Sequence, residues 1–219
     1  MFRNIPQAIE VTQGHLKALA AWRNAQGVEA RRVVQVSPEA GKLLAILLAG
    51  CPAGDAAELG TGGGLSALWL ALACRATGRR LTTFELDPNR AELARQSLSA
   101  ADVLDVVDLR EGDGLKGLEA LPELAFCFLD ADPGQARAAY ELALARLKPG
   151  GLVCVALPPG TPLNVLADKR PEAGSPLPPT PQSPGQANFR RFLFDAEMDA
   201  RVDAVILPVG AGLLVCRKV

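Results

Sequence analysis

The sequence predicts an α/β fold in which a mostly parallel sheet carries helices on both faces. Three observations predict it: strand and helix signals alternate from residue 55 to residue 157, a glycine-rich turn follows the first strand, and two strand-like segments come last. The alternation is typical of parallel sheets, because each crossover between parallel strands is usually made by a helix. The two final segments flank Gly210-Ala-Gly212, which predicts an antiparallel hairpin at the sheet edge.

The elements are expected in the following order. Ser37 and Pro38 predict the start of a helix over 38–50, with Ser37 as N-cap and Pro38 at the first helical position. The alternation then predicts strands over 55–60, 80–86, 106–110, 124–129 and 151–157. The helices between them are expected over 64–76, 88–101, 114–121 and 133–147. A helix over 186–198 leads to the last two strands, over 202–209 and 213–219, which makes the sheet seven-stranded.

Two segments stand outside this pattern. Residues 1–35 are predicted to form an N-terminal helical arm ahead of the main domain, 36–219, because apolar residues recur there at roughly helical spacing. Such an arm can cover a ligand, contact a substrate or pack in a dimer. Residues 158–184 hold nine of the 17 prolines. They indicate a flexible surface loop or, because they leave a strand at the ligand edge of the sheet, a lid.

Composition narrows the class of protein. The 219 residues suit one domain, and 49% apolar with 21% charged residues is ordinary for a soluble globular chain. A net charge of −1 gives no global electrostatic argument for binding nucleic acid. The five cysteines lack metal-ligand spacing, so buried free thiols are expected. Neither a signal peptide nor a membrane span is predicted, which makes the cytoplasm the expected location.

The glycine-rich turn predicts a site for a nucleotide-like cofactor. It reads Glu58-Leu-Gly-Thr-Gly-Gly-Gly64, follows an apolar run and opens an Ala/Leu-rich helix. Glycines let the backbone turn sharply and approach a ligand closely. Glu85, at the end of the next strand, suits the two hydroxyls of a ribose. A dinucleotide fingerprint requires a third glycine where this chain has Leu65, which disfavours a nicotinamide cofactor.

The E-x-G-x-G-x-G pattern resembles the first motif of class I S-adenosylmethionine (SAM) methyltransferases. Further motifs occur in order at family spacing: Val36-Ser-Pro-Glu39, Phe84-Glu-Leu-Asp-Pro88, Glu111-Gly-Asp113, Phe128-Leu-Asp-Ala-Asp132, Leu147-Lys-Pro-Gly-Gly151 and Leu207-Pro-Val-Gly-Ala-Gly212. From about residue 33 to residue 219 the chain resembles the catechol O-methyltransferase-like family, in its bacterial branch. The resemblance implies a Rossmann-like fold with one antiparallel strand and SAM as cofactor.

The resemblance also implies roles for residues around the first helix of the sheet. Val36 would line the cofactor pocket. Glu58, Gly60 and Gly62 would belong to the cofactor-binding loop. Ser66 would hydrogen-bond the methionine carboxylate at the N-terminus of its helix, a place that favours an anion through the helix dipole.

The later motifs imply contacts to the rest of the cofactor. Glu85 would take the ribose hydroxyls, and Gly112 and Asp113 would border the adenine. Asp130 would lie beneath the sulfonium and is the best candidate for a catalytic residue. Asp113 has a second interpretation as a turn or cap residue.

Three other polar residues are interpreted as structural. Asp132 precedes a proline, which favours an N-cap. His15 is the only histidine and is expected at the surface of the arm, and Tyr140 is expected to pack in an apolar helix.

The family pattern breaks where a metal is expected. In metal-dependent members, Mg²⁺ or Ca²⁺ is held by the fourth-strand Asp and by an Asp-Asn pair that ends the fifth strand. Asp130 is retained here, but Ala156 and Leu157 replace the pair, and Pro133 replaces a lysine that is a usual candidate for the general base. A hard cation requires several oxygen ligands, so no divalent metal is expected. Glu39 and the 158–184 loop are alternative sources of a base by position only.

The expected function is therefore SAM-dependent O-methylation of a small molecule without a divalent metal. The alternative is a pseudoenzyme or regulator that binds SAM or S-adenosylhomocysteine (SAH) without transferring methyl groups. A tRNA-modifying methyltransferase is a third hypothesis, disfavoured by the missing basic surplus. A homodimer is expected, because family members are commonly dimeric.

Overall fold

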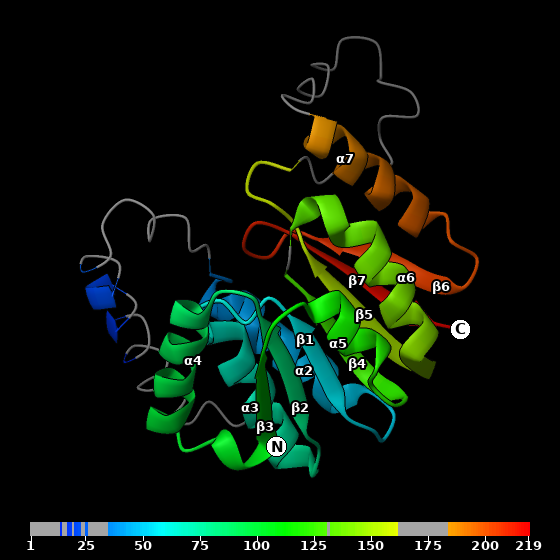
Figure 1. Ribbon diagram of the computed structural model, residues 1–219. Coiled ribbons are helices and arrows are strands. Elements are labelled where there is room, and N and C mark those ends of the chain that lie inside the picture. The colour runs from blue at the N-terminus through cyan, green and yellow to red at the C-terminus, as the bar shows by residue number, and fades with distance from the viewer. Residues whose placement is uncertain are drawn as a thin grey trace.

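The computed structural model describes residues 14, 17, 18, 20–22, 25, 35–130, 132–161 and 184–219. Its strands are β1 (Ala56–Leu59), β2 (Leu81–Glu85), β3 (Val107–Glu111), β4 (Leu124–Leu129), β5 (Leu147–Ala156), β6 (Val202–Leu207) and β7 (Leu213–Lys218). They form one seven-stranded sheet in the order β3-β2-β1-β4-β5-β7-β6 (Figure 1). β7 runs antiparallel to both β5 and β6, and the pairs among β1 to β5 are parallel. The predicted Rossmann-like α/β fold with a C-terminal antiparallel hairpin is confirmed.

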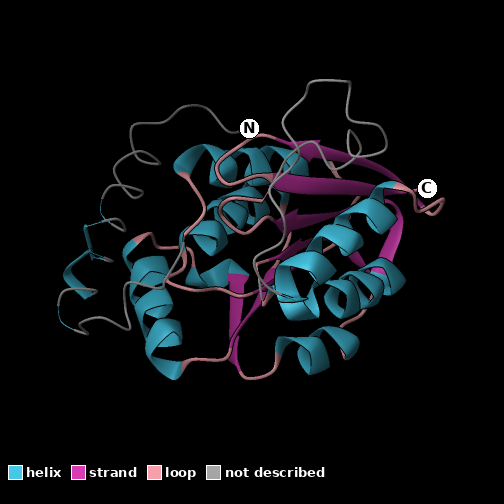
Figure 2. Cartoon of the chain, turned by 90° about the horizontal axis from the view of Figure 1, so that it is seen from above, coloured by secondary structure: helices cyan, strands magenta, loops and turns pink. Residues whose placement is uncertain are grey.

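Helices cover both faces of the sheet, as Figure 2 shows from above. They are α2 (Pro38–Gly50), α3 (Leu65–Thr77), α4 (Pro88–Ala100), α5 (Gly114–Glu119), α6 (Ala136–Arg146) and α7 (Pro184–Glu197), with 3-10 turns η2 (Leu104–Val106) and η3 (Pro133–Gln135). One core cluster joins the sheet to α2, α3 and α4, and a second joins it to α5, α6 and α7. Ser37 caps α2 as predicted, because the Ala40 N–H donates to its Oγ at 3.2 Å.

Two predicted boundaries are corrected around η3 and β5. The helix expected over 133–147 is divided into η3 and α6, because the Asp132 carboxylate accepts from the Gly134 N–H at 2.9 Å and closes a tight turn. The strand expected over 151–157 begins at Leu147. The pairing register shifts between Leu124 and Phe126 of β4, opposite the Pro-Gly-Gly run, and Gly150 adopts a φ of 78°. The run therefore produces a bulge within β5 rather than a loop before it.

The N-terminal arm is described only in part. Among its described residues, Trp22 packs against Leu93 of α4. His15, the rest of the arm, and residues 162–183, which include most of the segment predicted to be a loop or lid, lie outside the described residues.

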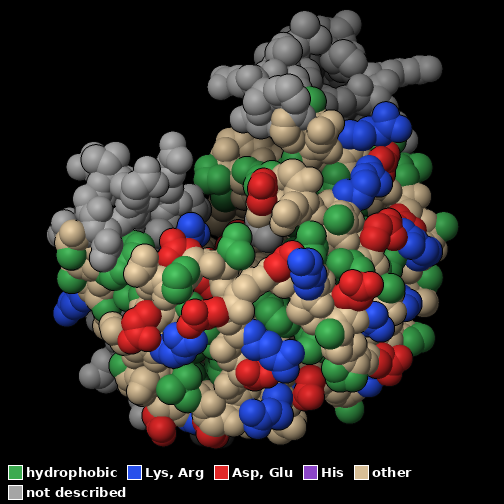
Figure 3. Space-filling model, in the orientation of Figure 1, with side chains coloured by type: hydrophobic (Ala, Val, Ile, Leu, Met, Phe, Trp, Pro, Cys, Tyr) green, Lys and Arg blue, Asp and Glu red, His purple; other side chains and the backbone are tan. Residues whose placement is uncertain are grey.

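The burial of the cysteines and the distribution of surface charge match what the composition predicts. All five cysteines are buried free thiols, as predicted. On the face shown in Figure 3, acidic and basic side chains are interspersed. Within the described part of the chain, none of the helices combines the length and apolarity needed to cross a bilayer.

Candidate active site

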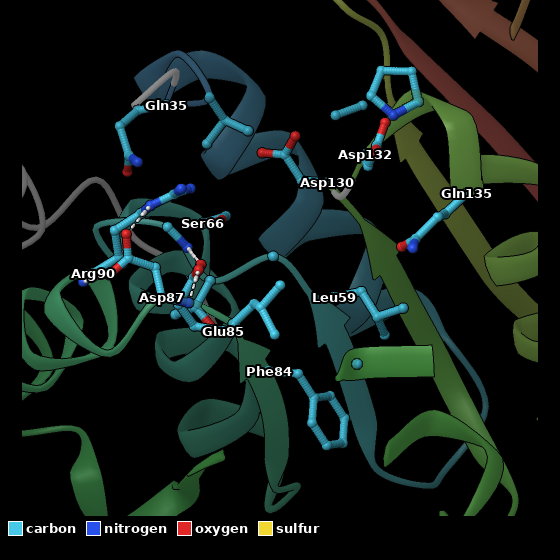
Figure 4. Close-up of a pocket in the computed structure, with 18 of the residues that line it drawn as sticks. Gln35, Leu59, Ser66, Phe84, Glu85, Asp87, Arg90, Asp130, Asp132 and Gln135 are labelled. Atoms are coloured by element: carbon cyan, nitrogen blue, oxygen red, sulfur yellow. Dashed lines mark hydrogen bonds and ion pairs between the residues drawn. The ribbon is translucent and has the colours of Figure 1, made fainter. Parts of the chain in front are cut away.

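A cavity of about 740 Å³ lies at the carboxyl ends of the parallel strands. It lies at the end of β1, whose neighbours in the sheet are β2 on one side and β4 on the other, and this is the usual ligand position in an open α/β sheet. Figure 4 shows two groups of side chains across it. We call the region around β1, β2 and the N-terminus of α3 the cofactor half, and the region around η3 and the ends of β4 and β5 the acceptor half.

The glycine loop requires its glycines. Gly60, Gly62 and Gly64 have φ angles of 88°, 55° and 94°, a region that L side chains rarely adopt. Gly64 is also the N-cap of α3, and a Cβ there would lie 3.1 Å from the Cα of Ala94 on α4. The glycine spacing in the sequence therefore reflects three residues in a positive-φ backbone conformation, which place the start of α3 at the cavity.

Glu85 is fixed at the end of β2 by backbone donors. The Gly62 N–H donates to its Oε2 at 2.7 Å, and the Asp87 N–H donates to its Oε1 at 2.9 Å. The residue is 5% exposed and lines the cavity. Each carboxylate oxygen retains capacity to accept a further hydrogen bond, so Glu85 is prepared to bind a pair of hydroxyls.

Glu58 lies behind the loop rather than at the cavity surface. It is fully buried, and the Thr83 hydroxyl donates to its Oε2 at 2.6 Å. Because Thr83 has one hydroxyl hydrogen, the 2.5 Å contact between Thr61 Oγ1 and Thr83 Oγ1 is a donation from Thr61. Burial raises the pKa of Glu58 to about 7, although the Ser66 and Thr83 hydroxyls lower it in part. Glu58 is thus linked to the glycine loop through Thr83 and Thr61.

The other residues predicted for the cofactor do line the cavity. These are Val36, Gly60, Gly62, Ser66, Glu85, Gly112, Asp113 and Asp130. The second interpretation of Asp113, as a cap residue, is confirmed, because its Oδ1 caps α5 by accepting from the Leu115 N–H at 3.0 Å. The Gly112 N–H donates to the Glu85 carbonyl at 2.9 Å, which ties this turn to the end of β2.

The acceptor half places one carboxylate beside apolar side chains. Burial, and to a smaller extent the charge of Glu85, raises the pKa of Asp130 to about 6. Ala156 and Leu157 line the cavity at the end of β5, where the family pattern has two metal ligands. Among the described residues, there is no group of three or more His, Cys, Asp or Glu side chains that could hold a metal ion.

The described lining of the cavity is acidic. Among the described residues, it carries five carboxylates and one guanidinium: Glu85, Asp87, Asp113, Asp130, Asp132 and Arg90. Arg90 pairs with Asp87 at 3.3 Å, which offsets part of its charge. Such a field favours a cationic ligand and opposes one that carries phosphates, which agrees with the sequence argument against a nicotinamide dinucleotide.

The remaining candidates are placed as follows. Glu39 is exposed on α2 and does not line the cavity. Tyr140 packs as predicted, since it is 2% exposed, contacts Phe192 edge-on and donates to Asp199 at 3.2 Å. Sequence reasoning missed Thr83, although the parallel register that pairs it with Glu58 is the signal that identifies it. It also missed Gln35, which carried no motif.

Comparison with known proteins identifies the family of the chain. A family model described as O-methyltransferase matches residues 11–219. A catechol O-methyltransferase from Niastella koreensis is 31% identical over 198 residues, covering 87% of this chain and 82% of that protein.

Solved structures show the same similarity. An O-methyltransferase from Bacillus cereus, solved in complex with SAH, superposes with a TM-score of 0.72 at 26% identity, covering 95% of this chain and 91% of that one. The O-methyltransferase TomG from Streptomyces achromogenes, solved with SAM, gives 0.71 at 25% identity and covers 100% and 92%. The chain therefore belongs to the O-methyltransferase family, as a catechol O-methyltransferase-like member of the class I SAM-dependent enzymes.

Proposed function

We propose that this enzyme methylates an oxygen of a small molecule, with SAM as donor and without the family's divalent-metal site. The observation that carries the proposal is the contrast inside one cavity. The cofactor half keeps Glu85 and the glycine loop in a fixed arrangement, whereas the acceptor half offers Ala156 and Leu157 in place of two metal ligands.

The residues of the cofactor half fit SAM. Glu85 would bind the ribose hydroxyls, and Gly112 and Asp113 would border the adenine. Ser66, second in α3 and 4% exposed, would bind the methionine carboxylate together with N–H groups of the first turn. When bound, SAM supplies an activated methyl group for an in-line displacement. The acidic walls of the cavity favour its sulfonium charge.

A divalent metal does not fit the acceptor half. Mg²⁺ and Ca²⁺ take oxygen ligands, and of the three side chains at the family's metal position only Asp130 supplies one. The acceptor must therefore lose its proton by another route.

Asp130 is the residue we assign to that proton. Backbone pairing holds it in place, because its N–H donates to the Leu59 carbonyl at 2.8 Å. Its pKa of about 6 leaves it ionised at neutral pH and more basic than an ordinary aspartate. The carboxylate is thus suited to accept the hydrogen of an acceptor hydroxyl as the oxygen is methylated.

The lining of the acceptor half favours an acceptor with an apolar body. Four apolar residues line this side, namely Pro133, Ala156, Leu157 and Pro158. A phenol combines an apolar ring with a relatively acidic hydroxyl and suits both features. The expected homodimer and cytoplasmic location stand as further predictions, the first tested by light scattering at micromolar concentration.

The direct test is a transfer assay with isotopically labelled SAM in the presence of EDTA. The acceptors are a panel of phenols, catechols and hydroxy acids, with bulk tRNA as a separate arm. Label transferred to a small hydroxyl compound supports the proposal. Transfer only to tRNA supports the third hypothesis, and SAH binding without transfer to any acceptor supports the binding-only alternative.

A further inference from the structure

Gln35 reaches over the glycine loop from the segment that precedes α2. Its Oε1 accepts a hydrogen bond from the Leu65 N–H at 3.3 Å, although the two residues are 30 positions apart. Its Nε2 lies against Gly62, where an added Cβ would be only 2.9 Å away. The carboxamide therefore spans the loop, with its oxygen at the first residue of α3 and its nitrogen next to the middle glycine.

The hydrogen bond from the Leu65 N–H to Gln35 replaces the side-chain cap that α3 lacks. The N-cap of α3 is Gly64, which has no side chain and makes no side-chain capping bond. The first N–H groups of a helix need acceptors from outside it. In this protein one such acceptor is supplied by Gln35, at the place where the proposed function puts the carboxylate of the cofactor.

The negative charge of the cavity lining disfavours a carboxylate at the N-terminus of α3. In the part of the cavity lining that the structure describes, five carboxylates stand against one guanidinium, and Arg90 is already paired with Asp87. These carboxylates repel an incoming carboxylate, which therefore needs neutral donors. The incoming carboxylate would also compete with Gln35 Oε1, because that oxygen already accepts the hydrogen bond of the Leu65 N–H.

A glutamine resolves this conflict because its end carries both an acceptor and donors. We propose that Gln35 recognises the carboxylate of the cofactor: its carboxamide turns so that Nε2 donates to the carboxylate, which then takes over the Leu65 N–H. The inference rests on the proposed function, since it places the amino-acid end of SAM at α3. It makes Gln35 a specificity-determining residue for ligands that carry a carboxylate.

The test compares two ligands on the intact protein. SAH carries the carboxylate, and its decarboxylated analogue S-adenosyl-3-thiopropylamine lacks only that group. Gln35→Glu keeps the size and the acceptor but cannot donate when ionised, and Gln35→Met removes both functions. Gln96→Glu is the matched control, because Gln96 is exposed on α4 and bonded to Glu92.

We expect Gln35→Glu to weaken SAH binding at least about tenfold, the effect of losing a hydrogen bond to a charged group and adding a like charge. Gln35→Met should weaken it by a smaller factor. Neither variant should weaken binding of the decarboxylated analogue, and Gln96→Glu should change neither ligand. Calorimetric titration gives all of these affinities.

Two results would overturn the inference while leaving the proposed function intact. Unchanged SAH affinity in both Gln35 variants would show that the carboxamide does not meet the carboxylate. Equal losses for SAH and the analogue would show that Gln35 only supports the loop. If the unmodified protein bound neither ligand, the proposed function and this inference would both be wrong.

Discussion

The cofactor half and the acceptor half of the cavity differ in how their polar groups are held. In the cofactor half, Glu85 receives two backbone N–H groups, and Gln35 caps Leu65 from across the loop. In the acceptor half, Asp130 stands beside Ala156 and Leu157. Under the proposed function, this difference means that binding of the methyl donor and activation of the acceptor are separate tasks. The first would use side chains that backbone N–H groups hold in place, and the second would use a few side chains at the ends of β4 and β5.

The largest effect is expected from Asp130→Asn. If Asp130 accepts the proton of the acceptor, turnover should fall about 100-fold or more, because general-base catalysis contributes factors of this size. SAH affinity should change little, since the change lies in the acceptor half. Steady-state kinetics and calorimetry separate the two effects. Asp132→Asn, which alters a capping carboxylate of the same cavity, should cost much less turnover, and the reverse ranking would move the base to Asp132.

Glu85→Ala should affect the cofactor half and weaken the binding of SAH. It removes an acceptor for the ribose and also frees the N–H groups of Gly62 and Asp87. Hydrogen bonds to a charged group are worth roughly 1.5–3 kcal/mol, so SAH should bind about 10- to 150-fold more weakly in calorimetry. Glu111→Ala is the control, because Glu111 pairs in register with Glu85 but ends β3 outside the cavity lining. Equal losses in both variants would remove Glu85 from the ribose site.

The thermal stability of Glu58→Gln, measured against pH beside that of the natural protein, tests whether the buried Glu58 carboxyl is protonated. The pKa of Glu58 is raised from 4.5 to about 7, so the folded state holds the proton more tightly than the unfolded chain. This contribution to stability is present at low pH and is lost as pH rises toward 7. Relative to the variant, the natural protein should lose up to about 3 kcal/mol over that interval, or several degrees in melting temperature. Parallel melting curves would exclude this assignment.

The smallest effect is expected from restoring the missing ligands. Ala156→Asp combined with Leu157→Asn supplies oxygen atoms next to Asp130, which hard divalent cations prefer. The double variant should gain a modest rise in melting temperature with Ca²⁺ or Mg²⁺, and the natural protein should show none. A response of equal size in the natural protein would mean that it binds the metal with other ligands.

Much of the fold follows from the sequence, because strand and helix signals alternate along the parallel part of the sheet. The positions of Glu85 and Asp130 also follow, because Glu85 ends β2 and Asp130 directly follows β4, at the edge where a parallel sheet binds its ligands. The bulge in β5 does not follow, because Pro and Gly ordinarily indicate a break in a strand.

The parts of the site that escaped prediction depend on side-chain direction and on distant contacts. Glu58 and Leu59 are neighbours on β1 whose side chains point to opposite faces, and the first points under α3 instead of into the cavity. Gln35 meets Leu65 only once α2 and α3 are packed together, so its spacing in the sequence carries no periodic signal.

The measurement that tests the central claim most directly is a calorimetric titration of the protein with SAH, performed once in EDTA and once with added Mg²⁺. The account predicts binding with the same affinity in both buffers, because the cofactor half is complete without a metal. Absence of binding, or binding that appears only when Mg²⁺ is present, would contradict it.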